Sequence, residues 1–155
     1  MGRKTLDERF WAKVHKTDSC WVWQGGTTPA GYGLIYAPQG SSRLKAAHRV
    51  AYELEIGPIP QGMEIDHICR RRNCVNPDHL RTATRSQNLQ NTSRYVNSKS
   101  GHRGVVWDRH CNRWVARVKH RGRSIYVGRF TDPEMARRAV VEKRKQLFTH
   151  NEDDR

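Results

Sequence analysis

The chain has 155 residues, with 29 Lys or Arg against 15 Asp or Glu, a formal net charge of +14 and a mean hydropathy of −0.91. This length suits one ordinary domain or two small modules, and 35% hydrophobic residues are too few for one large core. The surplus positive charge favours nucleic acid as a partner; five Trp and the absence of a long basic amphipathic helix argue against a ribosomal-type or a basic membrane-surface protein.

No apolar run approaches the roughly 18 residues of a membrane span, and no apolar segment follows the first residues as in a secretory signal. We therefore expect a soluble, cytoplasmic protein, in the host cell if a phage encodes it. Four Cys in such a chain, two of them close to a His, indicate metal binding rather than disulfides.

The first third of the chain predicts a helix, a hairpin and a second helix. Leu6, Phe10 and Val14 share one helical face, which predicts a short helix over residues 6–15. Residues 20–24 and 32–36 are rich in aromatic and branched side chains and flank a Gly-rich loop, which predicts a β-hairpin. Residues 46–56 place apolar side chains at helical spacing and stop at a Gly-Pro pair, so we expect a helix there.

A dense group of metal-ligand side chains follows in residues 64–80. Four residues separate Cys69 from Cys74 and four separate Cys74 from His79, and the turn signal Asn76-Pro77 lies between the last two. The order of elements is expected to be strand, loop, strand and helix. The helix is expected to start at residues 84–87, which fit a capping box. These three ligands predict most of a closed structural zinc site, which needs four.

This segment resembles the ββα-metal unit of the HNH and His-Cys-box nucleases. The resemblance implies that His67 is the general base and that Asn88, on the helix, binds a catalytic magnesium or manganese ion. Asp66 matches the Asp-His pair of the phage HNH nucleases and would be a further ligand of that metal. Neighbours on a regular strand point to opposite faces, however, so Asp66 reaches the site of His67 only if the strand bends or ends there. A spare histidine of the zinc loop is the alternative interpretation of His67.

The resemblance extends to the segment from Cys20 to Trp23. The His-Cys-box group has a distant upstream cysteine as a zinc ligand, which makes Cys20 the expected fourth ligand. His48 and Cys111 are the alternatives for that position.

Two basic groups near the zinc ligands are candidates for phosphate contacts. Arg70, Arg71 and Arg72 form a run inside the zinc loop, although a solvated charge run is nearly as good an interpretation. Arg49, which follows His48, is placed to contact the scissile phosphate.

Residues 93–98 are predicted to be a linker, and the chain beyond them is the more basic part. Residues 1–98 contain 14 Lys or Arg and 8 Asp or Glu, whereas residues 99–150 contain 14 and 4. Three strands are predicted in residues 104–107, 113–119 and 124–128, followed by a helix that begins at Asp132-Pro133. In the middle strand an apolar face with Trp114 alternates with a basic face that carries Arg113, Val115, Arg117 and Lys119.

Residues 99–150 resemble the AP-two type (ethylene-response-factor-like) DNA-binding domain. The resemblance implies a three-stranded sheet that reads duplex DNA with Arg103, Gly104, Arg117, Lys119, Tyr126 and Arg129. Val106 and Asp108 depart from the family, whose plant members tend to have arginines there, so the base preference does not transfer.

The sequence thus predicts an α+β protein with two modules: a zinc-stapled ββα-metal nuclease module over residues 1–92, and a small three-stranded antiparallel sheet packed on one helix over residues 99–150, followed by an acidic tail at residues 151–155. This layout matches the phage and mobile-intron HNH homing endonucleases. The predicted function is therefore magnesium-dependent cleavage of double-stranded DNA, with no obligatory protein partner and with a homodimer on DNA as one way to cut both strands. The alternatives are a DNA-binding regulator with a purely structural zinc box and, third, an RNA-binding protein.

Overall fold

A computed structural model describes residues 4–37, 43–91 and 99–151. These residues form two compact units, one ending at Thr84 and the other beginning at Arg85. The predicted linker at residues 93–98 lies outside the described residues, as does the predicted tail beyond residue 151. The division between the units precedes the third helix, whereas the sequence predicted a nuclease module that continues to residue 92.

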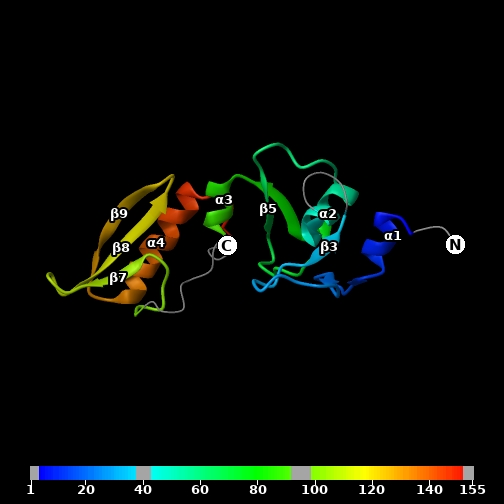
Figure 1. Ribbon diagram of the computed structural model, residues 1–155. Helices are drawn as coiled ribbons and strands as arrows, with labels where there is room; N and C mark the ends of the chain where they lie inside the picture. The colour runs from blue at the N-terminus through cyan, green and yellow to red at the C-terminus, as the bar shows by residue number, and fades with distance from the viewer. Residues whose placement is uncertain (1–3, 38–42, 92–98, 152–155) are drawn as a thin grey trace. The chain divides into compact units, whose positions relative to one another are not determined.

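The N-terminal unit consists of small elements, and its strands associate only in antiparallel pairs (Figure 1). In chain order the elements are α1 (Leu6–Trp11), β1 (Val14–His15), β2 (Val22–Trp23), β3 (Leu34–Tyr36), β4 (Leu44–Ala46), α2 (Ala47–Glu55), β5 (Glu64–His67), the 3-10 helix η1 (Pro77–His79) and β6 (Leu80–Ala83). The predicted helix at residues 46–56 and the predicted strand, loop and strand of residues 64–80 are confirmed by α2, β5 and β6.

The predicted helix over residues 6–15 is too long. It ends at Trp11, and Val14 and His15 form β1, which pairs with β2. The sequence pattern misled because Val14 contacts the same core as Phe10, although it does so from a strand. A capping box explains where the helix starts, since Thr5 and Glu8 each accept a hydrogen bond from the backbone N–H of the other.

The predicted hairpin between residues 20–24 and 32–36 is wrong. The first segment pairs with β1 and the second pairs with β4, through registers such as Val14↔Trp23 and Ile35↔Lys45. The chain between the segments does turn back on itself, through the bridge Thr27↔Gly33 and the hydrogen bond from Leu34 N to Gly26 O at 2.8 Å, but residues 20–24 take no part in it. Strand propensity identified the segments, but their partners depend on tertiary contacts that no local pattern reveals.

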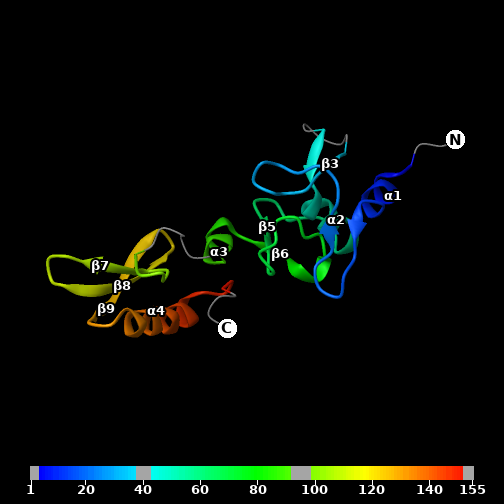
Figure 2. The same ribbon diagram turned by 90° about the horizontal axis from the view of Figure 1, so that it is seen from below.

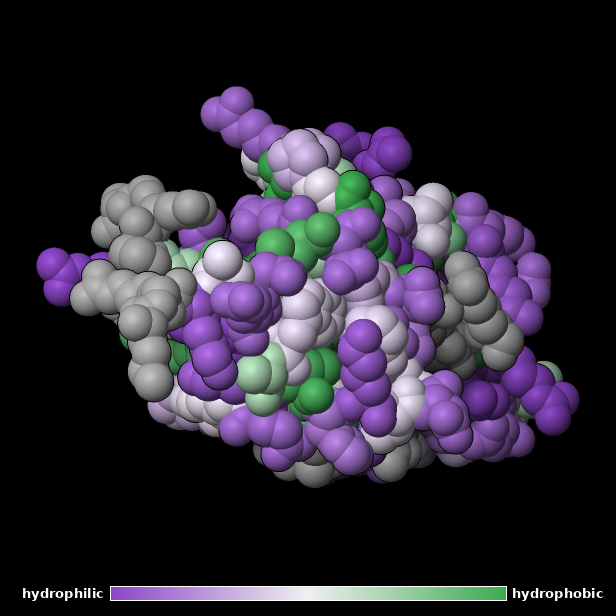
Figure 3. All heavy atoms as spheres, turned by 90° about the vertical axis from the view of Figure 1, so that its right-hand side faces the viewer, coloured by the Kyte–Doolittle hydropathy of each residue, from purple (hydrophilic) through white to green (hydrophobic). Residues whose placement is uncertain are grey.

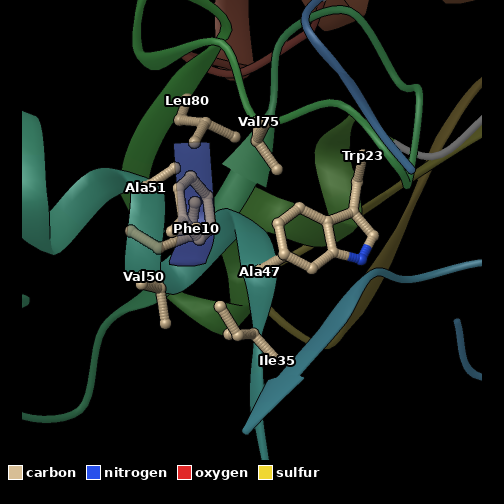
Figure 4. Close-up of a cluster of buried hydrophobic side chains, with 9 residues drawn as sticks. Phe10, Trp23, Ile35, Ala47, Val50, Ala51, Val75 and Leu80 are labelled. Carbon is tan, nitrogen blue, oxygen red and sulfur yellow. The ribbon is translucent and has the colours of Figure 1, made fainter. Parts of the chain in front are cut away.

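One core joins these small elements (Figure 4). The ring of Phe10 from α1 lies 5.1 Å from that of Trp23 on β2. The space around Trp23 is tight, because a Cβ on Gly33 would lie 2.6 Å from its ring. The remaining buried members come from β3, α2, β5, the zinc loop and β6: Ile35, Ala47, Val50, Ala51, Ile65, Val75 and Leu80.

The C-terminal unit contains α3 (Arg85–Gln90), β7 (Val105–Asp108), β8 (Arg113–His120), β9 (Arg123–Phe130) and α4 (Pro133–Leu147). The three strands form one antiparallel sheet in the order β7-β8-β9, as the sequence predicted. Helix α4 runs along one face of this sheet (Figure 2). It begins as expected, with Asp132 accepting a hydrogen bond from Glu134 N and proline in the first turn.

The core of this unit lies between α4 and the sheet. Its buried residues are Val105, Ala116, Val118, Ala136 and Val140. The opposite face of β8 is basic, with exposed Arg117 and Lys119, but Val115 on that face is buried, with an exposed fraction of 3%. The predicted open basic face is therefore interrupted by one buried apolar residue.

Candidate functional site

The zinc loop begins where β5 ends. Arg70 N donates to His67 O at 2.9 Å, and Arg70 adopts a positive φ of 58°, which turns the chain away from the strand direction. Cys74 N then donates to Arg71 O at 3.1 Å. These two turns fold the Cys69–Cys74 segment back on itself, so that both thiols lie on one side of the loop.

Asn76 brings His79 to the same place. Its side-chain oxygen accepts a hydrogen bond from Asp78 N at 3.1 Å and caps η1, which ends at His79. Its side-chain amide donates to Ser19 O at 2.7 Å. Asn76 is buried, and through these two bonds it connects the zinc loop with the segment that precedes Cys20.

Backbone hydrogen bonds place Cys20 beside the loop. Trp23 N donates to Asn73 O at 2.9 Å, and Val75 N donates to Trp21 O at 2.8 Å. A single β-bridge joins Val22 to Cys74. The strand that follows Cys20 is therefore attached to the loop that carries Cys74, across more than fifty residues of sequence.

The four predicted zinc ligands meet at one point. The ligand atoms of Cys20, Cys69, Cys74 and His79 all lie within 4.8 Å of one another. His79 Nδ1 lies 3.6 Å from the Sγ atoms of both Cys20 and Cys74. A tetrahedral ion with Zn–S of about 2.3 Å and Zn–N of about 2.0 Å holds such atoms about 3.6 Å apart. The Cys3His cluster therefore fits a structural zinc, and it contains Cys20 rather than His48 or Cys111.

The close contact of the thiols changes the protonation of two of them. A hydrogen bond from Cys69 lowers the pKa of Cys74 to about 4, and the same contact raises the pKa of Cys69. Zinc binds thiolates, so binding to this cluster releases the proton that the two thiols otherwise share. All four tetrahedral positions are occupied by protein atoms, which is the arrangement of a structural rather than a catalytic zinc.

His67, the last residue of β5, is oriented by the zinc loop. Its Nε2 lies 3.1 Å from Cys74 O, and a carbonyl can only accept, so Nε2 carries the proton. The acceptor nitrogen of the neutral ring is therefore Nδ1. Burial lowers the pKa of His67 below its usual 6.5, so the ring is neutral near pH 7. A neutral imidazole with a defined acceptor nitrogen has the properties of a general base.

Asp66 is bound by Arg81 on the neighbouring strand β6. β5 is regular through Asp66 and His67, and the register pairs Asp66 with Arg81 and His67 with Leu80. Arg81 Nε donates to Asp66 Oδ2 at 2.9 Å, and Arg81 Nη2 lies 2.8 Å from the same oxygen as part of the ion pair. β5 ends at His67, which was one of the two conditions for Asp66 to reach the site, and the prediction that Asp66 binds a catalytic metal stays a prediction.

His48 is a neighbour of His67 that the sequence suggested only as a zinc ligand. It lies on the inner side of α2, and the centroids of the two imidazole rings are 4.7 Å apart. The ring of Tyr32 lies 5.5 Å from His48 and 6.1 Å from His67. Burial lowers the pKa of His48 to about 3, and repulsion from a protonated His67 and from Arg49 acts in the same direction. The signal in the sequence for the buried position of His48 was a polar residue among the apolar positions of a predicted helix.

The predicted phosphate contacts differ in their surroundings. Arg71 and Arg72 are both exposed, and Arg70 is half-buried. Arg72 also donates to Ala30 O at 2.9 Å and lies over the ring of Tyr32. Arg49 lines a shallow pocket of about 330 Å³ together with Leu44, Lys45, Ala46 and Glu53. Hydrophilic residues cover most of the face seen in Figure 3, with only small apolar patches between them.

Four of the predicted DNA contacts of the C-terminal unit lie exposed on one face of its sheet. These are Arg117 and Lys119 on β8 and Tyr126 and Arg129 on β9; Arg113 at the start of β8, which was also predicted to contact DNA, is exposed as well. Gly104 is required by the backbone, because its φ is +85° and a Cβ there would lie 2.4 Å from Arg117 O.

Arg103 does not belong with these exposed residues. Its guanidinium donates to Leu89 O at 3.0 Å and to Gln90 O at 2.9 Å, at the C-terminal end of α3. Gln90 Oε1 in turn accepts hydrogen bonds from Thr149 N and His150 N. These bonds attach α3, which carries the half-buried Asn88, to the C-terminal unit. The prediction that Asn88 acts together with His67 stays a prediction.

In the comparison with known proteins, one family model covers both the candidate base and the zinc loop. Residues 45–90 match the model of the HNH endonuclease family. This HNH region contains both neighbouring histidines, three of the four zinc ligands and Asn88, whereas Cys20 and the C-terminal sheet lie outside it. The match supports a nuclease activity in general.

The relatives that match are phage proteins. The chain is 31% identical over 100 residues to Protein 2.8 of Escherichia phage T7, which covers 64% of this chain and 66% of that protein. It is 34% identical over 73 residues to Protein 7.7 of the same phage, covering 47% of this chain and 54% of the relative. The third is the Uncharacterized gene 5.3 protein of Enterobacteria phage T3, with 35% identity over 63 residues, 41% of this chain and 62% of the relative. The chain thus spans less than two thirds of each relative. No solved structure matches it significantly.

Among the described residues, no helix combines the length and the apolar character needed to cross a bilayer.

Proposed function

We propose that this protein is an HNH-type endonuclease that hydrolyses phosphodiester bonds of double-stranded DNA in the host cytoplasm. One observation carries the proposal: inside the HNH region, the carbonyl of the zinc-ligand residue Cys74 holds His67 Nε2 and leaves Nδ1 as the acceptor. The structural zinc site therefore fixes the tautomer of the proposed base.

In the proposed reaction, His67 Nδ1 takes a proton from a water molecule whose oxygen forms a bond to phosphorus. The ester bond to one sugar oxygen breaks, and that oxygen takes up a proton from the solvent. His67 suits this role because burial keeps it neutral near pH 7. Arg49 in its pocket and exposed Arg71 are proposed to hold the DNA backbone near this centre.

A divalent metal, magnesium or manganese, would neutralise charge on the phosphate and on the leaving oxygen. Asn88 offers the hard oxygen that such ions prefer, and we propose it as the protein ligand. Asp66 fits this role less well, because its carboxylate already binds Arg81.

The C-terminal unit is proposed to position the enzyme on duplex DNA. Exposed basic residues on β8 and β9, together with Tyr126, support an AP-two type contact with DNA. A nuclease module joined to such a reader supports the finer proposal of a homing-type enzyme. A homodimer on DNA is the proposed route to double-strand cleavage.

Incubation of the full chain with supercoiled plasmid and magnesium or manganese tests the proposal. We expect nicked or linear product, and we expect His67→Ala to lower the cleavage rate by about 100- to 10,000-fold while DNA affinity and zinc content stay the same. His15→Ala is the matched control, because His15 is an exposed histidine of the same unit.

Two results would contradict the proposal. If His67→Ala loses DNA binding and zinc to the same extent as cleavage, the residue is structural. If the wild-type chain binds duplex DNA but leaves it uncut with either metal, the protein is a DNA-binding regulator whose closed Cys3His site serves only its fold.

A further inference from the structure

His48 is costly to the fold and has no structural partner that explains it. The residue is 8% exposed, and its Nδ1 is buried without a hydrogen bond. Among the described residues, the contacts of its ring are aromatic ones, to His67 and Tyr32. An apolar side chain of similar volume would pack there without burying an unsatisfied nitrogen.

The buried nitrogen determines the tautomer of His48. A buried N–H without an acceptor is rarer and less favourable in proteins than a buried acceptor without a donor. The proton of the neutral ring therefore sits on Nε2. Nε2 does not belong to the buried side-chain atoms that lack a hydrogen bond. It is therefore the ring nitrogen that is accessible from the surface.

The two histidines thus present complementary groups. His67 offers an acceptor at Nδ1, and His48 offers a donor at Nε2, on rings whose centroids are 4.7 Å apart. Both rings are held in place, His67 by the Cys74 carbonyl and His48 by its position on α2 between buried Ala47 and Val50. A base and a fixed donor side by side are the two parts that attack on a phosphate requires.

We propose that His48 is a second catalytic residue, whose Nε2–H donates a hydrogen bond to a non-bridging oxygen of the scissile phosphate while His67 activates the water. This inference rests on the proposed nuclease function. His48 gains and loses no proton in the step: its donor stabilises the negative charge that builds up on the phosphate oxygen. Its low pKa agrees with this role, because the ring stays neutral throughout the pH range of the assay.

Three substitutions distinguish the two nitrogens. His48→Gln keeps an N–H donor near the position of Nε2, His48→Asn places its polar atom near Nδ1, and His48→Phe keeps a ring without any donor. We expect His48→Phe to lower the single-turnover cleavage rate by about 100-fold, as the loss of one oxyanion donor does. His48→Gln should recover at least tenfold of this loss, and His48→Asn should recover none.

Zinc content, DNA affinity and thermal unfolding are measured for the same proteins. His48→Phe should keep its zinc and its affinity for duplex DNA, and its melting temperature should equal or exceed that of the wild type, because the unsatisfied nitrogen is gone. Val50→Ala is the control for general loosening of α2, since it removes a buried side chain on the same helix without touching the imidazole pair.

The proposal is overturned if His48→Phe cleaves at the wild-type rate, or if His48→Asn restores cleavage as well as His48→Gln does. It is also overturned if both polar variants lose rate only in proportion to lost zinc or lost folded protein, as Val50→Ala would. A wild-type chain that cuts no DNA removes the nuclease function and this inference together, whereas equal cutting by wild type and His48→Phe removes only the role of His48.

Discussion

The two compact units reach a stable fold by different means. In the N-terminal unit the strands are two to four residues long and occur only in pairs, and the Cys3His cluster lies where three chain segments meet. In the C-terminal unit two eight-residue strands and a 15-residue helix enclose an apolar core, and the unit's described residues contain no cluster of His, Cys and acidic side chains like the Cys3His site. Extended, regular elements bury their own faces, whereas short ones depend on a staple.

Because of this difference, the proposed cleavage and the proposed DNA binding depend on different units. The proposed base is oriented by a carbonyl of the zinc loop, so His67 is oriented only when the metal site is folded. The exposed basic face of β8 and β9 depends only on the alternation of a regular sheet. We therefore expect metal removal to abolish cleavage while DNA binding by the C-terminal unit persists.

The largest expected effect comes from breaking the zinc site. Cys74→Ser, or a chelator, should unfold the N-terminal unit, because structural zinc in a small domain supplies on the order of 10 kcal/mol. Hydrogen exchange should then show lost protection before residue 84 and retained protection in β7–β9 and α4. Cys111→Ser is the control, since that cysteine lies in the other unit. Equal loss of protection in both units would contradict their independence.

The next effect tests how α3 is attached to the C-terminal unit. Arg103→Ala removes two hydrogen bonds from a charged group to the carbonyls of Leu89 and Gln90, and should lower the free energy of unfolding by roughly 2 kcal/mol. Urea unfolding of the zinc-stripped chain measures the C-terminal unit alone. Exposed Arg109 offers the control Arg109→Ala, expected to change nothing. A DNA contact at Arg103 would instead appear as lost affinity with unchanged stability.

The basic sheet face predicts a change in salt dependence. The double variant Arg117→Ala/Lys119→Ala should reduce the slope of log affinity against log salt by about two if both contact phosphates, since each contact contributes close to one. Arg137→Ala/Arg138→Ala removes the same charge from exposed positions of α4 and should leave the slope nearly unchanged. Fluorescence anisotropy at several salt concentrations gives both slopes. Equal slopes for the two variants would exclude the sheet face as the binding surface.

The smallest effect concerns pH and the buried His48. Its pKa falls from 6.5 to about 3 on folding, so the unfolded chain binds this proton first. The part of the free energy of unfolding that depends on a neutral ring is fully present above pH 6.5 and is lost as pH falls from there toward 3. Between pH 7.5 and 5.5 the wild type should lose about 1 kcal/mol more than His48→Phe, measured by urea unfolding with zinc present. Parallel pH profiles would show that folding does not lower the pKa of His48.

Much of the proposed site could be predicted because its signals are local. The spacing of Cys69, Cys74 and His79 around a turn predicts a metal loop in any fold that allows the turn. Asp132 followed by Pro133 marks the start of α4, since capping involves only neighbouring residues. The alternation in β8 likewise predicted which residues face α4 and which face outward.

Other features depend on contacts between distant parts of the chain. Strand propensity over residues 20–24 could not reveal that β2 joins β1 and the zinc loop, because hydrogen-bond partners are chosen by the packing of the whole core. Arg103 was predicted to contact DNA from its sequence neighbours, and that stays a prediction; its hydrogen bonds to Leu89 O and Gln90 O, 14 and 13 residues away, are contacts that no local pattern reveals.

Sequence alone determined the ligand types, the caps and the alternation of faces, because these follow from the chemistry of a residue and its near neighbours. The tertiary structure decided the rest: that Cys20 completes the cluster, that Asp66 turns to Arg81, and that His48 lies against His67. The physical reason is that strand register and helix packing set which side chains meet, and both are properties of the whole folded core.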